Sequence, residues 1–112
     1  MIEVSTTRQD GVPIMALTGE LDGDGSVAAA ARELLDKRGA TVVLDLRAVP
    51  FVNSAGISEL VTLVSQANVQ EQRVLMAAAT PFVRGLFRTT RLDHFFSMYS
   101  SVEEAAGAAK GA

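Results

Sequence analysis

The stretch that decides the fold is VVLDLRAVPFVNSAGISELVTLV, residues 42–64. Its first part, residues 42–46, is apolar except for Asp45, as expected for a strand that is covered on both faces. Its last part has apolar residues at spacings of three and four, which is typical of a helix with one apolar stripe. That stripe consists of Ile57, Leu60, Val61 and Val64. Ser54 stands at the start of this helix, a position that suits either a structural cap or a modification site.

The flanking sequence predicts alternating strands and helices. Residues 2–6 and 12–17 predict a hairpin that turns at Asp10-Gly11. Helix starts are predicted at Ser26 or Asp24, at Thr80-Pro81 and at the capping box Ser101–Glu104. A buried strand is predicted at residues 74–78 and a last strand at residues 95–99. The order β, β, α, β, α, β, α, β, α indicates the α/β class, with a mixed sheet of four to five strands and about four helices.

The chain of 112 residues has the size of one domain, which we expect to span residues 1–112. Its net charge is −3, without a basic run, which argues against nucleic-acid binding. It contains no cysteine, so disulfides and zinc–thiolate sites are excluded. No apolar run is long enough for membrane insertion and no signal-peptide pattern is present, so a cytoplasmic location is expected.

Signals of catalysis are few. His94 is the only histidine, and no G-x-S-x-G, P-loop or G-x-G-x-x-G motif occurs. We therefore expect a protein that is not an enzyme and needs no cofactor.

A calcium loop is the one metal pattern to weigh. Asp22, Asp24, Ser26 and Glu33 fall at positions 1, 3, 5 and 12 of such a loop. Position 6 needs glycine for its sharp turn, but Val27 stands there. We interpret the segment as an acidic loop that leads into a helix, without a metal site.

The helix that begins at Ser54 has a small polar face opposite its apolar stripe. Ser54, Ser58 and Thr62 follow one line along it, with Glu59 beside them. This face is either solvated surface or a docking face for another protein. Asn53 could cap the helix as well as Ser54, and Gly56 is expected to leave room for a partner. A phosphate on Ser54 would add about −1.5 to −2 charges at pH 7, which a partner interface near Glu59 or Asp22 would oppose.

The aromatic residues are assigned to the core. Phe51, Phe95 and Phe96 are expected to be buried, and Phe82 is placed in the apolar stripe of the helix that follows Thr80.

The pattern VVLDLRAVPFVNSAGISEL resembles the signature of the STAS domain family, in particular the bacterial anti-sigma factor antagonists. The segments GELD at 19–22 and TPFVRGLF at 80–87 match further parts of that pattern, so the resemblance covers about residues 2–106.

The resemblance implies a protein that binds an anti-sigma factor, which is itself a serine kinase, and thereby releases a sigma factor. It further implies phosphorylation at Ser54, reversed by a PP2C-type phosphatase. Separately from the resemblance, we expect a monomer or weak dimer. The expected partner-binding residues are Asp22, Asn53, Ser54, Gly56, Ser58, Glu59 and Thr62. One departure is Asn53, where phosphorylated members usually have aspartate; if that carboxylate helps to position the serine, phosphate transfer here is slow or absent.

Two other functions remain open. A small STAS subunit that docks on an ABC-transporter ATPase in lipid transport needs no phosphorylation, so Asn53 is no obstacle to it. A ligand sensor would instead bind a nucleotide near residues 19–22 and Ser54.

Overall fold

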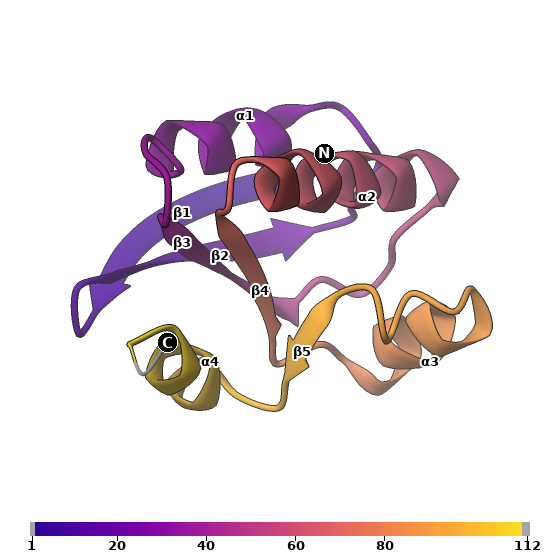
Figure 1. Cartoon of the computed structure of the whole chain (residues 1–112). Helices are drawn as coiled ribbons and strands as arrows, with labels where there is room; N and C mark the ends of the chain where they lie inside the picture. Colours follow the sequence, from indigo (N-terminus) through magenta and orange to yellow (C-terminus); the bar gives the residue numbers. More distant parts are fainter. Residues whose placement is uncertain (1, 111–112) are drawn as a thin grey trace.

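A five-stranded mixed sheet forms the centre of the molecule, and helices pack around it (Figure 1). The computed structural model describes residues 2–110. In chain order the elements are β1 (Ile2–Gln9), β2 (Val12–Gly19), α1 (Ser26–Leu34), β3 (Thr41–Ala48), α2 (Ser54–Val69), β4 (Arg73–Ala77), α3 (Pro81–Thr89), β5 (Ser97–Tyr99) and α4 (Val102–Lys110). The strands lie side by side in this order; β1 is antiparallel to β2, and all later neighbours are parallel. The predicted fold class is confirmed.

The N-terminal hairpin turns where the sequence predicted. Gln9 pairs with Val12, and the two residues between them, Asp10 and Gly11, have φ values of 53° and 80°. Two positive φ angles in a two-residue loop match the right-handed twist of the flanking strands.

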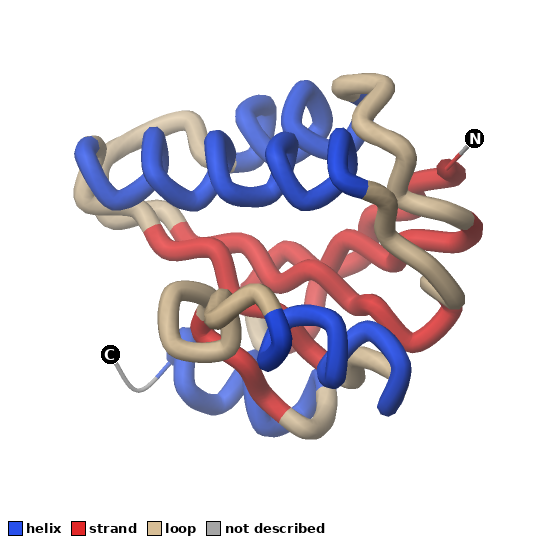
Figure 2. Tube along the Cα trace, turned by 90° about the vertical axis from the view of Figure 1, so that its right-hand side faces the viewer, coloured by secondary structure: helices blue, strands red, loops and turns tan. Residues whose placement is uncertain are grey.

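Strand β3 is covered on both faces, which explains its nearly continuous apolar run. Alternate side chains of β3 point into two apolar cores, one shared with α1 and α2 and one shared with α4. Figure 2 shows helices on both sides of the sheet. The exception in the run, Asp45, is also buried, and its carboxylate accepts hydrogen bonds from the backbone N–H and the guanidinium of Arg47 at 3.0 and 2.9 Å.

Helix α3 begins as predicted. The Thr80 hydroxyl oxygen accepts the backbone N–H of Val83 at 3.2 Å, and Pro81 occupies the first turn, where its missing N–H costs nothing. Val83 and Phe87 are fully buried in the core that α1 and α2 share. This packing fixes α3 against the same core.

The last strand is shorter than predicted. Phe95 and Phe96 belong to a turn in which both of their N–H groups donate to the carbonyl of Leu92, at 3.0 and 2.8 Å. Phe96 is buried, as predicted, and its ring meets Phe87 edge-on at 5.0 Å. Phe95 is 39% exposed, so its assignment to the core was wrong.

Candidate partner-binding site

Asn53, and not Ser54, caps helix α2. The Asn53 backbone is extended, and its side-chain oxygen accepts the N–H of Gly56 at 2.8 Å. Ser54 is the first helical residue and is exposed. Within residues 2–110 its hydroxyl has no hydrogen-bond partner. Asn53 is therefore the N-cap of α2, and the Ser54 hydroxyl is accessible.

The loop between β2 and α1 pairs with the segment that leads into α2. The N–H of Leu21 donates to the carbonyl of Phe51, and the N–H of Asn53 donates to the carbonyl of Leu21, both at 3.0 Å. Leu21 and Val52 thus form an isolated parallel bridge beyond the ends of β2 and β3. This pairing holds residues 20–25 alongside the first turn of α2.

Two glycines allow this close approach. A Cβ atom at Gly56 would overlap the Leu21 carbonyl oxygen, and one at Gly23 would lie 2.5 Å from the Ala55 Cβ. Gly23 also has a φ of 82°, which favours glycine. Gly56 is buried, so the expectation that it leaves room for a partner was wrong; the room is taken by the chain's own loop.

Glu59 connects the two helices that border the site. Its carboxylate accepts the N–H groups of Gly25 at 3.3 Å and Ala28 at 2.9 Å, at the N-terminus of α1. Gly25 is the N-cap of α1 and has no side chain, so the predicted caps Asp24 and Ser26 were wrong. Glu59, expected on a docking face, is half-buried in a structural role.

Asp24 bonds to its own loop. Its carboxylate accepts the Ser26 hydroxyl at 2.6 Å and the Ser26 N–H at 2.9 Å. Both bonds lower the pKa of Asp24 below its ordinary value, and the bond from the Ser26 hydroxyl has the larger effect. The loop therefore keeps a negative charge beside the start of α2.

The remaining predicted site residues lie together. Ser54, Ser58 and Thr62 are all exposed along α2. A shallow groove of about 350 Å³ runs between α1 and α2. Its lining consists of Gly23, Gly25, Ala28, Arg32, Ala55, Ser58, Glu59 and Thr62. This line of small polar side chains, with the groove beside it, is the candidate docking face.

Two aromatic side chains at the edge of this face were assigned wrongly from the sequence. Phe51 is 40% exposed and Phe82 is 57% exposed, and their ring centroids lie 5.8 Å apart. Apolar periodicity places a residue on one side of a helix, but it does not show whether another element covers that side. The positions themselves held a signal, because each follows a proline in a loop or at a helix start.

A larger hollow of about 630 Å³ lies between the C-terminal ends of α1 and α2. Polar side chains along it already bind within the chain. Arg32 donates to Gln66 at 2.6 Å, and Arg38 pairs with Glu71 at 3.1 Å. The side-chain amide of Gln72 donates to the backbone carbonyls of Leu35 and Lys37, which follow α1. With these groups occupied, we assign the hollow a structural role.

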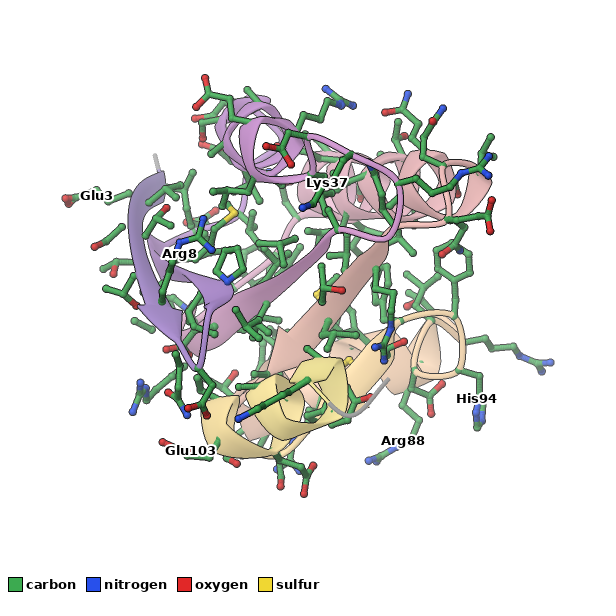
Figure 3. All side chains as sticks on the ribbon, turned by 60° about the vertical axis from the view of Figure 1, so that its left-hand side comes forward. Glu3, Arg8, Lys37, Arg88, His94 and Glu103 are labelled. Atoms are coloured by element: carbon green, nitrogen blue, oxygen red, sulfur yellow. The ribbon has the colours of Figure 1, made fainter. Side chains whose placement is uncertain are left out.

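His94 is exposed and points away from the body of the molecule, 3.9 Å from Asp93 (Figure 3). In the described part of the chain, no three acidic or histidine side chains converge as metal ligands would. Among the helices of residues 2–110, none combines the length and apolarity needed to cross a bilayer.

The comparisons with known proteins identify the family of this chain. The model of the STAS domain family matches residues 3–105. BtrV of Bordetella bronchiseptica, a proposed anti-sigma factor antagonist, is 26% identical over 99% of this chain and 97% of its own length.

Solved structures show the same fold. An anti-sigma factor antagonist from Mycobacterium paratuberculosis is 25% identical and superposes with a TM-score of 0.75, over 98% of this chain and 95% of that chain. Part of the murine anion transporter Slc26a9 superposes with a TM-score of 0.76 at 18% identity, over 95% of this chain and 19% of the transporter. The chain belongs to the STAS domain family.

Proposed function

We propose that this chain is an anti-sigma factor antagonist, which binds an anti-sigma factor through the N-terminal end of α2 and releases the sigma factor. The observation that carries this proposal is the exposed, unbonded Ser54 hydroxyl beside an asparagine that already caps the helix. The relatives from Bordetella and Mycobacterium are named anti-sigma factor antagonists, which supports the proposal.

Phosphorylation of Ser54 is the proposed switch. A phosphate would lie at the positive end of the α2 dipole, which favours its negative charge, and the first turn of α2 itself holds no acidic residue. The acidic β2–α1 loop lies beside this turn and opposes the dipole, so we expect the added charge to change the stability of the fold little. A docked partner would instead have to bury that charge, which opposes binding.

In this scheme the chain is a ligand and a substrate, and other proteins carry out the chemistry. The anti-sigma factor acts as the serine kinase, and a PP2C-type phosphatase removes the phosphate. The proposed docking residues are Asp22, Asn53, Ser54, Ser58 and Thr62, on and beside α2.

The test is to measure affinity for the anti-sigma factor by calorimetry and to map the phosphate by mass spectrometry. Wild type should bind and then acquire a single phosphate at Ser54, after which its affinity falls. Ser54→Ala should bind without being phosphorylated. Ser65→Ala, which changes an exposed serine of the same helix, is the matched control and should behave as wild type.

Phosphate at another residue, or unchanged phosphorylation of the Ser54→Ala variant, would overturn the switch. Co-purification of an ABC-transporter ATPase instead of an anti-sigma factor would overturn the proposed function in favour of the lipid-transport subunit.

Asn53 provides a second test of the switch. Asn53→Asp keeps an oxygen that can accept the Gly56 N–H and adds the carboxylate that phosphorylated family members have at this position. If the carboxylate positions the serine, the variant should be phosphorylated faster than wild type at equal affinity for the kinase. An equal or lower rate would show that the asparagine does not limit transfer.

A further inference from the structure

The exposed Phe51–Phe82 pair is the most unusual feature of the surface next to Ser54. Phe51 lies three residues before Ser54 in the chain. The ring of Phe82, in the first turn of α3, packs against the ring of Phe51. Large apolar side chains that contact each other and remain about half exposed typically mark an interaction site. Aromatic residues are also the residues most often found to dominate binding energy at protein interfaces.

Both aromatic residues stand on rigid backbone. The carbonyl of Phe51 accepts the N–H of Leu21 at 3.0 Å, and Phe82 follows Pro81 in the capped first turn of α3. Little conformational freedom is therefore lost when a partner covers the two rings. A pre-ordered aromatic pair is suited to act as an anchor.

The residues immediately around the pair are uncharged. Residues 48–58 and 74–83 contain no Asp, Glu, Lys or Arg, and they are bordered by Arg47, which pairs with Asp45, and by Arg84 on α3. Ser54 and Ala55 continue this uncharged surface along the exposed side of α2. The rings and the start of α2 thus form one neutral surface, which favours an apolar partner segment.

The rim of this surface has one sign of charge on the side of the β2–α1 loop. Residues 18–31 contain Glu20, Asp22 and Asp24 and no Lys or Arg, and the next basic residue, Arg32, donates to Gln66. The backbone bond between Leu21 and Phe51 fixes this loop next to the aromatic pair. Charge complementarity therefore requires basic side chains on the partner opposite the loop.

We propose that Phe51 and Phe82 form the apolar anchor of the docking surface, and that the anti-sigma factor covers them with apolar side chains flanked by Lys or Arg. This inference rests on the proposed function and specifies the chemistry of the partner's contact segment. A phosphate on Ser54 would place its charge at the edge of the anchor, where the partner excludes water. The anchor thereby explains why one added phosphate suffices to weaken docking.

The test measures the affinity of two double variants and one single variant for the anti-sigma factor by surface plasmon resonance. Phe51→Ser/Phe82→Ser should bind at least about 30-fold more weakly than wild type. Phe51→Leu/Phe82→Leu keeps the apolar character and should retain most of the affinity. Val69→Ser removes a 78% exposed apolar side chain at the far end of α2 and is the matched control, with wild-type affinity. Circular dichroism and melting temperature confirm that each variant folds.

The negative charge of the β2–α1 loop is tested separately, through the rate of association with the anti-sigma factor. Glu20→Lys should slow association, and the difference from wild type should shrink as salt is raised. Glu103→Lys, on α4, is the control and should leave the association rate unchanged (Figure 3).

Wild-type binding together with unchanged binding of the folded Phe51→Ser/Phe82→Ser variant would overturn the anchor while leaving the proposed function intact. Failure of wild type itself to bind would overturn the proposed function. Sedimentation of the isolated chain tests a second copy as the occupant: a wild-type dimer that the serine variant loses, with anti-sigma binding unaffected, would also overturn the anchor.

Discussion

The carboxylate of Glu59, on α2, caps the N-terminus of α1 by accepting the backbone N–H of Ala28 at 2.9 Å. Its second oxygen accepts the N–H of Gly25 at 3.3 Å. A cap normally comes from the residue before the helix, but here that residue is a glycine. The negative charge also lies at the positive end of the α1 dipole. One side chain thus joins both helices that border the groove.

We expect Glu59→Ala to lower the free energy of unfolding by about 1 kcal/mol, because the first turn of α1 loses its acceptor. Glu59→Gln keeps one oxygen and should lose less. Urea denaturation followed by circular dichroism measures the change. Glu103→Ala removes a carboxylate from the exposed face of α4 and serves as control. Equal stability of the Glu59→Ala and Glu103→Ala variants would show that the cap contributes nothing.

Gly56→Ala should destabilise the fold by about 1–3 kcal/mol, because the new methyl group would overlap the Leu21 carbonyl oxygen. Gly85 lies in the middle of α3 with nothing within 4 Å of an added Cβ. Gly85→Ala should therefore raise stability by up to about 1 kcal/mol through helix propensity alone. Thermal melts of the pair compare the same chemical change with opposite expected signs. A stabilised Gly56→Ala variant would contradict the contact with the loop.

Asn53 and Ser54 should respond differently to alanine. Asn53→Ala removes the cap of α2 and should cost about 1 kcal/mol of unfolding free energy. Ser54→Ala removes an exposed hydroxyl that bonds to nothing in residues 2–110, so its effect should stay within about 0.5 kcal/mol. Chemical denaturation of both variants decides the matter. If the Ser54→Ala variant lost the larger amount, the serine would be the true cap.

The pKa of Asp24 should lie below that of an ordinary carboxyl group, and Ser26→Ala should raise it by removing the donating hydroxyl. Because the folded-state pKa is the lower one, the charged form contributes stability above the unfolded-state pKa. That contribution is lost as the pH falls through the folded-state value. A carboxyl ¹³C NMR titration of wild type and the Ser26→Ala variant measures both midpoints. An unchanged midpoint would contradict the bond.

Local patterns in the sequence predicted those parts of the fold that depend on neighbouring residues. The strand and helix of residues 42–64, the Asp10-Gly11 turn and the Thr80-Pro81 start all follow from backbone preference and apolar spacing. The cap of α1 could not be found this way, because Glu59 lies 31 residues beyond Ala28 in the chain.

At the site, too, the features set by neighbouring residues were predicted and those set by distant residues were not. Ser54 was identified correctly as an exposed residue at a helix start, but the role of Gly56 was not, because its neighbour Leu21 comes from a distant loop. Phe51 was placed in the core for its hydrophobicity and Phe82 for its apolar spacing, whereas burial depends on which elements the fold brings over them.

The assignment of capping to Asn53 has a consequence for how the proposed signal is stored. Since Asn53 is the cap, a phosphate on Ser54 would break no bond that holds the helix end, so the modified form should unfold, and be degraded, no faster than the unmodified form. The cell would then read the ratio of two long-lived forms. A regulator built in this way can pass through many cycles of modification without being resynthesised.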